Sequence, residues 1–154
     1  MNYTDTLMAD LSDAAVRGAF RTYYEELGVK VSNWEGLFAE ISASQACFFV
    51  RRNQDGEVIG FLLFVMTGAE TAGRGFFSTR LGCIEEFWIA PEYRNQAHGT
   101  ALLRLAEKHF AQLGCAYAIL TTDTAPQFYE KQGYRLQRGI TAKNKSNVYI
   151  KPLV

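Results

Sequence analysis

The order of apolar segments between residues 81 and 120 constrains the fold of this chain more than any other feature. An apolar run with strand character covers residues 81–90, and an amphipathic helix follows it and ends at Gly114. The stripe of that helix consists of Leu102, Leu103, Ala106, Phe110 and Leu113. The run at 115–120 is apolar on both faces, as expected for a strand inside a sheet covered by helices on both sides. This strand, helix and strand predict a right-handed parallel crossover.

The segments around the crossover predict a mixed α/β domain. Helical spacing of apolar residues predicts a first helix over 12–27, capped by Ser12 and ended by Gly28. A second, short helix is expected from Ser32 or Asn33 to Ser42. A short helix over 124–132, capped by Asp123, is expected after the crossover. The expected strands are residues 47–50, 58–65, 81–90, 115–120, 134–137 and 147–150.

Turn and loop signals connect these elements. The Asp55-Gly56 pair predicts a hairpin turn, and residues 67–79 are glycine-rich and polar, which is typical of a loop. No linker or internal repeat divides the sequence. We therefore expect one domain over residues 1–154, with a central mixed sheet of about six or seven strands and helices on both faces.

Composition limits the classes of function. The formal net charge is zero, so a polyanionic partner such as nucleic acid is not expected. Three cysteines, Cys47, Cys83 and Cys115, lie far apart in apolar segments, which favours a reducing compartment such as the cytoplasm over a disulfide framework or a metal site. No segment approaches the roughly 20 apolar residues of a membrane span, and we see no targeting signal.

The polar loop that enters the helix after residue 93 is suited to bind a phosphate. The first amide groups of a helix lack intrahelical acceptors and lie at the positive end of the helix dipole. A phosphate or diphosphate therefore docks there readily. The alternative is a plain connection from strand to helix with a solvated Arg94.

Two adjacent acids, Glu85 and Glu86, interrupt the apolar strand before this loop. Successive strand side chains point to opposite faces, so only one of the two can face a given site. A lysine-like ammonium has a pKa of about 10.4, and freeing its lone pair at pH 7 costs roughly 4–5 kcal/mol, so a carboxylate beside a reacting amine has a clear task. The alternative is a salt bridge at the end of the strand.

Three segments together resemble the GNAT superfamily of acyl-CoA-dependent N-acyltransferases, over roughly residue 58 to the C-terminus. They are the strand and loop at 85–94, the turn Arg94-x-x-Ala97-x-Gly99, and the segment at 125–134. The resemblance implies a sheet splayed between the strands at 81–90 and 115–121, with the pantetheine arm of acetyl-CoA in that gap. It also implies that backbone amides of the turn hold the diphosphate of coenzyme A.

Ala97 stands where the family turn has its first glycine. A β-carbon obstructs close approach of a ligand to the backbone, and at a positive φ it adds a cost on the order of 1–2 kcal/mol. Each amide bonded to a charged phosphate oxygen contributes roughly 1.5–3 kcal/mol, so several such bonds could outweigh one imperfect residue.

The resemblance also implies roles for single residues. Polyamine acetyltransferases of the family have adjacent acids on this strand, which favours Glu85 as the base and Glu86 as the second candidate. Tyr129 matches the family tyrosine beside the coenzyme sulfur, where it acts as general acid or as a hydrogen-bond donor to the thiolate; core packing is the alternative. Thr122 stands where the family usually has Asn. The other expected coenzyme-binding residues are Phe87, Trp88, Ile89, Arg94, Asn95, Gln96, Ala97, His98, Gly99, Thr100 and Phe128.

The resemblance implies direct transfer of an acetyl group from acetyl-CoA to a primary amine in a ternary complex, with no metal. A non-catalytic acyl-CoA-binding sensor or regulatory module of the same fold is the rival. A small-molecule or peptide amine is the expected acceptor. Aromatic residues of the first two helices could line its pocket, although core packing explains most of them: Tyr23, Tyr24, Trp34 and Phe38.

The remaining histidine and cysteine side chains are not expected to take part in catalysis. His98 is expected to face solvent and His109 to lie on the helix surface, while Cys115 is expected to be buried and inert, which argues against an acyl-cysteine route. Edge strands near the C-terminus could pair two subunits.

Overall fold

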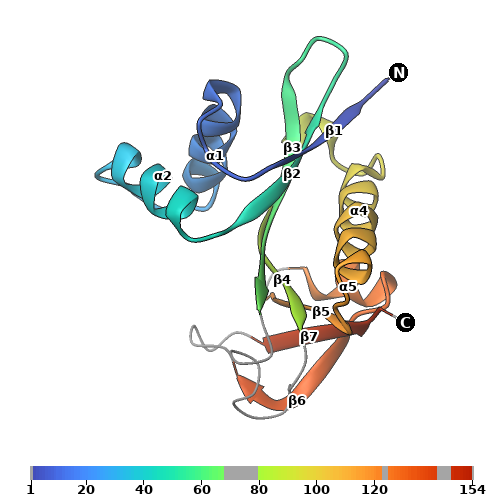
Figure 1. Ribbon diagram of the computed structural model, residues 1–154. Coiled ribbons are helices and arrows are strands. Elements are labelled where there is room, and N and C mark those ends of the chain that lie inside the picture. Colours follow the sequence, from blue (N-terminus) through green and yellow to red (C-terminus); the bar gives the residue numbers. More distant parts are fainter. Residues whose placement is uncertain (1, 68–79, 123–124, 142–146, 154) are drawn as a thin grey trace. The chain divides into compact units, whose positions relative to one another are not determined.

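The computed structural model describes residues 2–67, 80–122, 125–141 and 147–153 (Figure 1). The strands are β1 (Thr4–Met8), β2 (Cys47–Arg52), β3 (Val58–Thr67), β4 (Leu81–Ile89), β5 (Tyr117–Thr121), β6 (Arg135–Thr141) and β7 (Asn147–Pro152). The helices are α1 (Ala14–Glu26), α2 (Trp34–Ala43), α4 (His98–Gln112) and α5 (Pro126–Lys131), with a 3-10 turn η1 (Pro91–Tyr93). The predicted loop at 67–79 falls almost entirely outside the described residues.

The strands form one seven-stranded, mostly antiparallel sheet in the order β1-β2-β3-β4-β5-β7-β6, and helices flank it. The predicted mixed α/β class and strand number are therefore confirmed. Chain contacts divide the molecule into two compact units, described separately below. The first unit is residues 1–63 and 86–102, and the second is residues 64–85 and 103–154. A single domain over residues 1–154 remains a prediction.

In the first unit, the N-cap of α1 lies one residue later than predicted. The carboxylate of Asp13 accepts hydrogen bonds from the amides of Ala15 (2.8 Å) and Val16 (3.2 Å), so Asp13 is the N-cap and the prediction of Ser12 is wrong. Both residue types can cap a helix, but the charge of Asp also interacts favourably with the helix dipole. Gly28 follows the helix with a φ of 76°, as expected for a helix stop.

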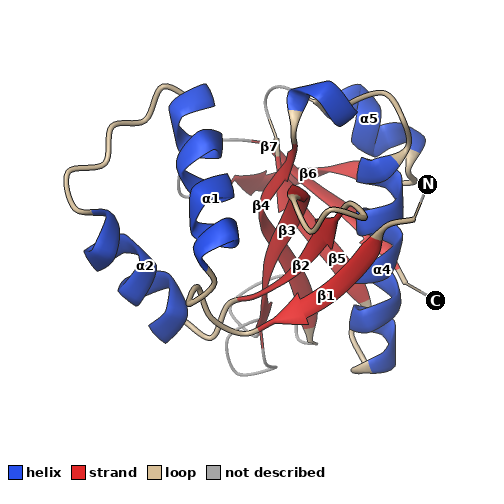
Figure 2. Cartoon of the chain, turned by 90° about the horizontal axis from the view of Figure 1, so that it is seen from above, coloured by secondary structure: helices blue, strands red, loops and turns tan. Residues whose placement is uncertain are grey.

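Aromatic rings hold α1 on the sheet within this unit. Phe20 stacks on Phe61 of β3, with ring centroids 4.2 Å apart, and meets Phe48 of β2 edge to face. All three rings are fully buried. α1 and α2 lie side by side (Figure 2), where Tyr24 contacts Trp34. This packing fixes the α1 face that carries Tyr23.

β1 is a strand that the sequence pattern does not predict. It pairs antiparallel with β2, from Thr4 opposite Arg52 to Met8 opposite Phe48. All but the last of its side chains are exposed, so no alternation of apolar and polar residues marks it. β1 is therefore a strand because its backbone pairs with β2, and its hydrophobic pattern gives no sign of this pairing.

In the second unit, the predicted parallel crossover is confirmed. β4 and β5 pair in parallel through the first three residues of β4: Leu81 lies opposite Tyr117, Gly82 opposite Ala118 and Cys83 opposite Ile119. α4 connects the two strands, and the buried ring of Phe110 lies so close over Gly82 that a β-carbon there would stand 2.3 Å from it. A larger residue at this position would therefore force the helix away from the sheet.

Two details of this unit differ from the sequence analysis. Leu113, expected on the buried stripe, is 43% exposed because α4 ends at Gln112. The N-cap of α5 is Ala125, whose amide donates to Oγ1 of Thr122 (3.1 Å). Asp123, expected as the cap, lies outside the described residues. None of the helices in the described ranges has the length and apolar character needed to cross a membrane.

Candidate functional site

The loop before α4 belongs to the first unit, and α4 begins at His98. The carbonyl of Ala97 accepts the hydrogen bond of the Ala101 amide (3.0 Å), so Ala97 is in the N-cap position. Amides in the first turn of a helix have no intrahelical acceptor, and the helix dipole adds positive potential there. A helix start of this kind is chemically suited to an anion.

Two residues of this loop have left-handed backbone conformations. Asn95 has a φ of 62° and Ala97 a φ of 69°. Asn tolerates this region, whereas Ala at this φ carries a cost on the order of 1–2 kcal/mol. Ala97 therefore occupies a position that favours the glycine of the family turn.

Side chains hold the start of the loop. Nε of Arg94 donates to the carbonyl of Ile89 (2.8 Å), and Nη2 donates to Oε2 of Glu26 (2.5 Å). Gln96 donates through Nε2 to the carbonyl of Glu92 (3.0 Å). Arg94 is therefore part of an ion pair, although its side chain stays 41% exposed, as the alternative of a solvated side chain expects.

Glu26 ends α1, and Trp88 of β4 also binds it. The indole Nε1 of Trp88 donates to Oε1 of Glu26 (3.1 Å), and Trp88 is 6% exposed. Hydrogen bonds from Arg94 and Trp88 lower the pKa of the Glu26 carboxyl. Sequence reasoning missed Glu26. The only signal was an acid at the end of a helix, where the dipole disfavours negative charge.

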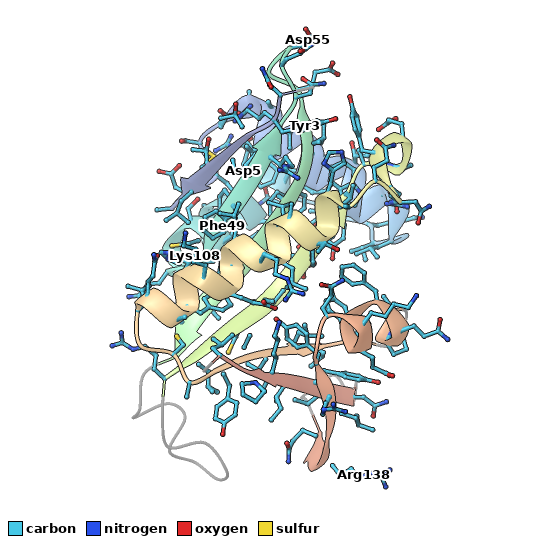
Figure 3. The ribbon with its side chains drawn as sticks, turned by 90° about the vertical axis from the view of Figure 1, so that its right-hand side faces the viewer. Tyr3, Asp5, Phe49, Asp55, Lys108 and Arg138 are labelled. Atoms are coloured by element: carbon cyan, nitrogen blue, oxygen red, sulfur yellow. The ribbon has the colours of Figure 1, made fainter. Side chains whose placement is uncertain are left out.

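His98 anchors the end of the loop and is buried, so the prediction that it faces solvent is wrong. Its ring meets Tyr3 (4.5 Å between centroids) and Tyr93 (5.8 Å) edge to face. Its Nδ1 lies 3.2 Å from Nη1 of Arg51, and Nε of Arg51 lies 3.0 Å from Asp5. Asp5 lies on β1 and Tyr3 lies just before it; both are labelled in Figure 3.

The Arg51 contact fixes the state of the imidazole. A guanidinium can only donate, so Nδ1 of His98 is the acceptor and the ring is neutral with its proton on Nε2. Burial, and then the charge of Arg51, lower the pKa of His98, while Asp5 acts in the opposite direction. The partners of His98 come from residues 3–51 and from η1, which no motif near the loop indicates.

The two acids of β4 have different surroundings, as the alternation of strand side chains predicts. Glu86 is half-buried, and the hydroxyl of Tyr23 donates to its carboxylate. Glu85, in the second unit, is exposed. Burial, and then the charge of Glu86, raise the pKa of Tyr24. Of the neighbouring residues expected to bind coenzyme, Phe87 and Ile89 are half-buried.

Tyr129 lies on α5, in the second unit, and contacts two aromatic rings. It meets Phe128 (5.1 Å between centroids) and Tyr134 (5.8 Å) edge to face. Its carbonyl accepts from the amide of Tyr134 (3.0 Å). Burial raises the pKa of Tyr129 to about 12. The Tyr129 phenol is therefore protonated at neutral pH and has a proton to donate.

A buried carboxylate fixes the segment after α5. Glu107 of α4 accepts from the hydroxyl of Tyr134 (2.9 Å) and from Nζ of Lys151 (2.9 Å), and pairs with Arg104 (2.9 Å). Burial and Glu107 raise the pKa of Tyr134. Sequence reasoning did not find this cluster, because its members come from α4, the segment between α5 and β6, and β7.

The remaining candidate side chains are buried or half-buried and contribute to packing. Cys115 is 4% exposed and burial raises the pKa of its thiol, which confirms the prediction of a buried, unreactive cysteine. His109 is half-buried and lies edge-on to Phe64, so it is not a surface residue. Phe38 is fully buried, as expected for a core ring. Within the described ranges, no cluster of three or more His, Cys, Asp or Glu could hold a metal ion.

Comparisons with known proteins identify the family. A sequence profile of the acetyltransferase (GNAT) family matches residues 8–134, which is most of the chain. The chain therefore belongs to this family. A search of curated protein sequences finds no match.

Solved structures share the fold at low sequence identity. A candidate N-acetyltransferase from Lactobacillus plantarum is 21% identical, with a TM-score of 0.73 and full coverage of both chains (100% each). An acetyltransferase of the GNAT family from Staphylococcus aureus is 15% identical, with a TM-score of 0.70, and the match covers 98% of this chain and 100% of that one. N-acetylglutamate synthase from Neisseria gonorrhoeae, complexed with coenzyme A and N-acetyl-glutamate, is 16% identical with a TM-score of 0.72; the match covers 100% of this chain and 36% of the synthase.

The strain at Ala97 predicts that Ala97→Gly stabilises the protein. Removing the β-carbon at a φ of 69° should raise the free energy of unfolding by about 1 kcal/mol, measured by urea denaturation. Asn95→Gly is the matched control and should gain less, because Asn tolerates the same region. Equal stability of Ala97→Gly and the unmodified chain would contradict this interpretation.

The surroundings of His98 predict that stability decreases at mildly acidic pH. The folded-state pKa lies below the usual value of 6.5, so the unfolded chain binds more protons between the two values. The contribution of neutral His98 is complete above pH 6.5 and is lost as the pH falls towards the folded-state pKa. An NMR titration, with His98→Gln to assign the signal, checks this. A His98 midpoint at or above the usual value would contradict it.

Proposed function

We propose that the protein transfers an acetyl group from acetyl-CoA to a primary amine. Membership of the acetyltransferase (GNAT) family supports acyl transfer. The observation that carries the proposal is the loop at the start of α4, where Asn95 and Ala97 keep left-handed conformations next to the amides of the first helical turn. Backbone strain of this kind persists at functional sites. The related synthase fold also holds coenzyme A.

The proposed reaction is direct attack within a ternary complex. The amine nitrogen forms a bond to the thioester carbonyl carbon, the carbon–sulfur bond breaks, and the products are an amide and the thiol of coenzyme A. The amine must lose a proton before or during attack. Glu85 is the proposed base and Glu86 the alternative. Because the two carboxylates occupy opposite faces of β4, one of them acts at the site and the other does not.

Tyr129 is proposed to stabilise the leaving sulfur by a hydrogen bond. Full proton transfer from a phenol of pKa about 12 to a thiolate of pKa about 8.5 is uphill by roughly 5 kcal/mol. A hydrogen bond to the developing charge has no such requirement and strengthens as the thiolate forms. The proton on the product thiol then comes from solvent or from the protonated base.

The proposal predicts amine-dependent release of thiol from acetyl-CoA that depends on Tyr129. Turnover of Tyr129→Phe should fall at least about tenfold, with the affinity for acetyl-CoA nearly unchanged, because the lost bond forms mainly in the transition state. The assay follows free thiol with a panel of small amines and peptides, after calorimetry has confirmed binding of acetyl-CoA.

Glu85→Gln and Glu86→Gln form a matched pair in the same assay. Loss of turnover in one variant, with the other close to the unmodified chain, identifies the base. Tight binding of acetyl-CoA without release for any amine would favour the rival, an acyl-CoA sensor. Absence of binding would contradict both.

A further inference from the structure

One face of α1 binds two side chains of β4 within the first unit. Tyr23 and Glu26 are three residues apart, so they lie on the same face of the helix. Tyr23 donates to Glu86 and Glu26 accepts from Trp88, and these partners point to the same face of the strand. The two contacts fix the end of α1 against β4.

Glu26 connects this contact to the loop. Its Oε1 is bound to Trp88 and its Oε2 to Nη2 of Arg94, so both carboxylate oxygens are used. Arg94 is bound at its other side to the carbonyl of Ile89. The guanidinium is therefore held between α1 and β4, immediately before Asn95.

The loop conformation needs such support. Asn95 and Ala97 are left-handed non-glycine residues within three positions of Arg94. Residues in sparsely populated backbone regions keep their conformation only where the surrounding contacts over-determine it. Within the first unit, the contacts of Arg94 with Ile89 and Glu26 fix the start of the loop, and the buried side chain of His98 fixes its end.

We propose that Glu26 is a positioning residue for the coenzyme, which acts through Arg94 to hold the loop in the conformation that binds a diphosphate. This inference rests on the proposed function. The proposed coenzyme site then extends to α1. One turn before Glu26, the same helix contacts Glu86 through Tyr23. Glu26 itself makes no contact with the coenzyme in this account.

Calorimetry with coenzyme A tests the inference. Glu26→Gln keeps an acceptor for Trp88 but removes the ion pair, and we expect coenzyme A to bind about fivefold more weakly, a modest effect because the pair is partly exposed. Glu25→Gln is the matched control: it makes the same charge change one residue earlier, on an exposed side chain, and should bind coenzyme A like the unmodified chain.

A double-mutant cycle separates positioning from a general loss of stability. Glu26 acts through Arg94, so Glu26→Gln should weaken binding no further in an Arg94→Gln background. The inference would be overturned if the losses of affinity in the two single variants added up in the double variant. It would also be overturned if Glu26→Gln alone bound coenzyme A as tightly as the unmodified chain, or more tightly. Tighter binding would show that Glu26 competes with the diphosphate for Arg94. If Glu26→Gln does not fold, Glu26→Asp is used and should give a smaller loss. Failure of the unmodified chain to bind coenzyme A would overturn the proposed function as well.

Discussion

The left-handed backbone at Asn95 and Ala97 is the constraint on which the candidate coenzyme site depends. It turns the chain from β4 and η1 into α4, whose first turn lies at the positive end of the helix dipole. An alanine in this conformation is unfavourable by itself, and the neighbouring side chains keep it there. Arg94 holds the start of the loop through Ile89 and Glu26, and His98 holds its end through Arg51 and two aromatic rings.

At each end of the loop, one of the holding contacts comes from a part of the chain outside the three segments that resemble the family. Glu26 ends α1, while Arg51 and Asp5 belong to two paired strands at the N-terminal side of the sheet. The same helix places Tyr23 on Glu86. The N-terminal part of the first unit therefore does more than cover hydrophobic surface, because it contacts both the loop before α4 and Glu86. Ion pairs of partly exposed groups contribute little to stability, so their value here lies in fixing geometry.

Sequence reasoning predicted the parts of the fold that depend on local pattern. The crossover from β4 through α4 to β5 was predicted from apolar periodicity, and Gly28 and Gly56 mark the helix end and hairpin turn with positive φ angles. β1 was missed because its side chains are mostly exposed and long-range pairing defines it. The burial of His98 and the role of Glu26 were missed for a related reason: their partners are 47 and 68 positions away in the sequence, and only the tertiary structure brings them together.

A titration of the isotope-labelled protein with coenzyme A, followed by the backbone amide signals, tests the central claim most directly. If the loop at the start of α4 holds the diphosphate, the amide signals of residues 96–100 shift most, and they shift in parallel at one affinity. The same signals should respond to inorganic pyrophosphate at higher concentration, because the contacts are made by the diphosphate itself. Saturable shifts elsewhere in the chain, with residues 96–100 unchanged, would contradict the account.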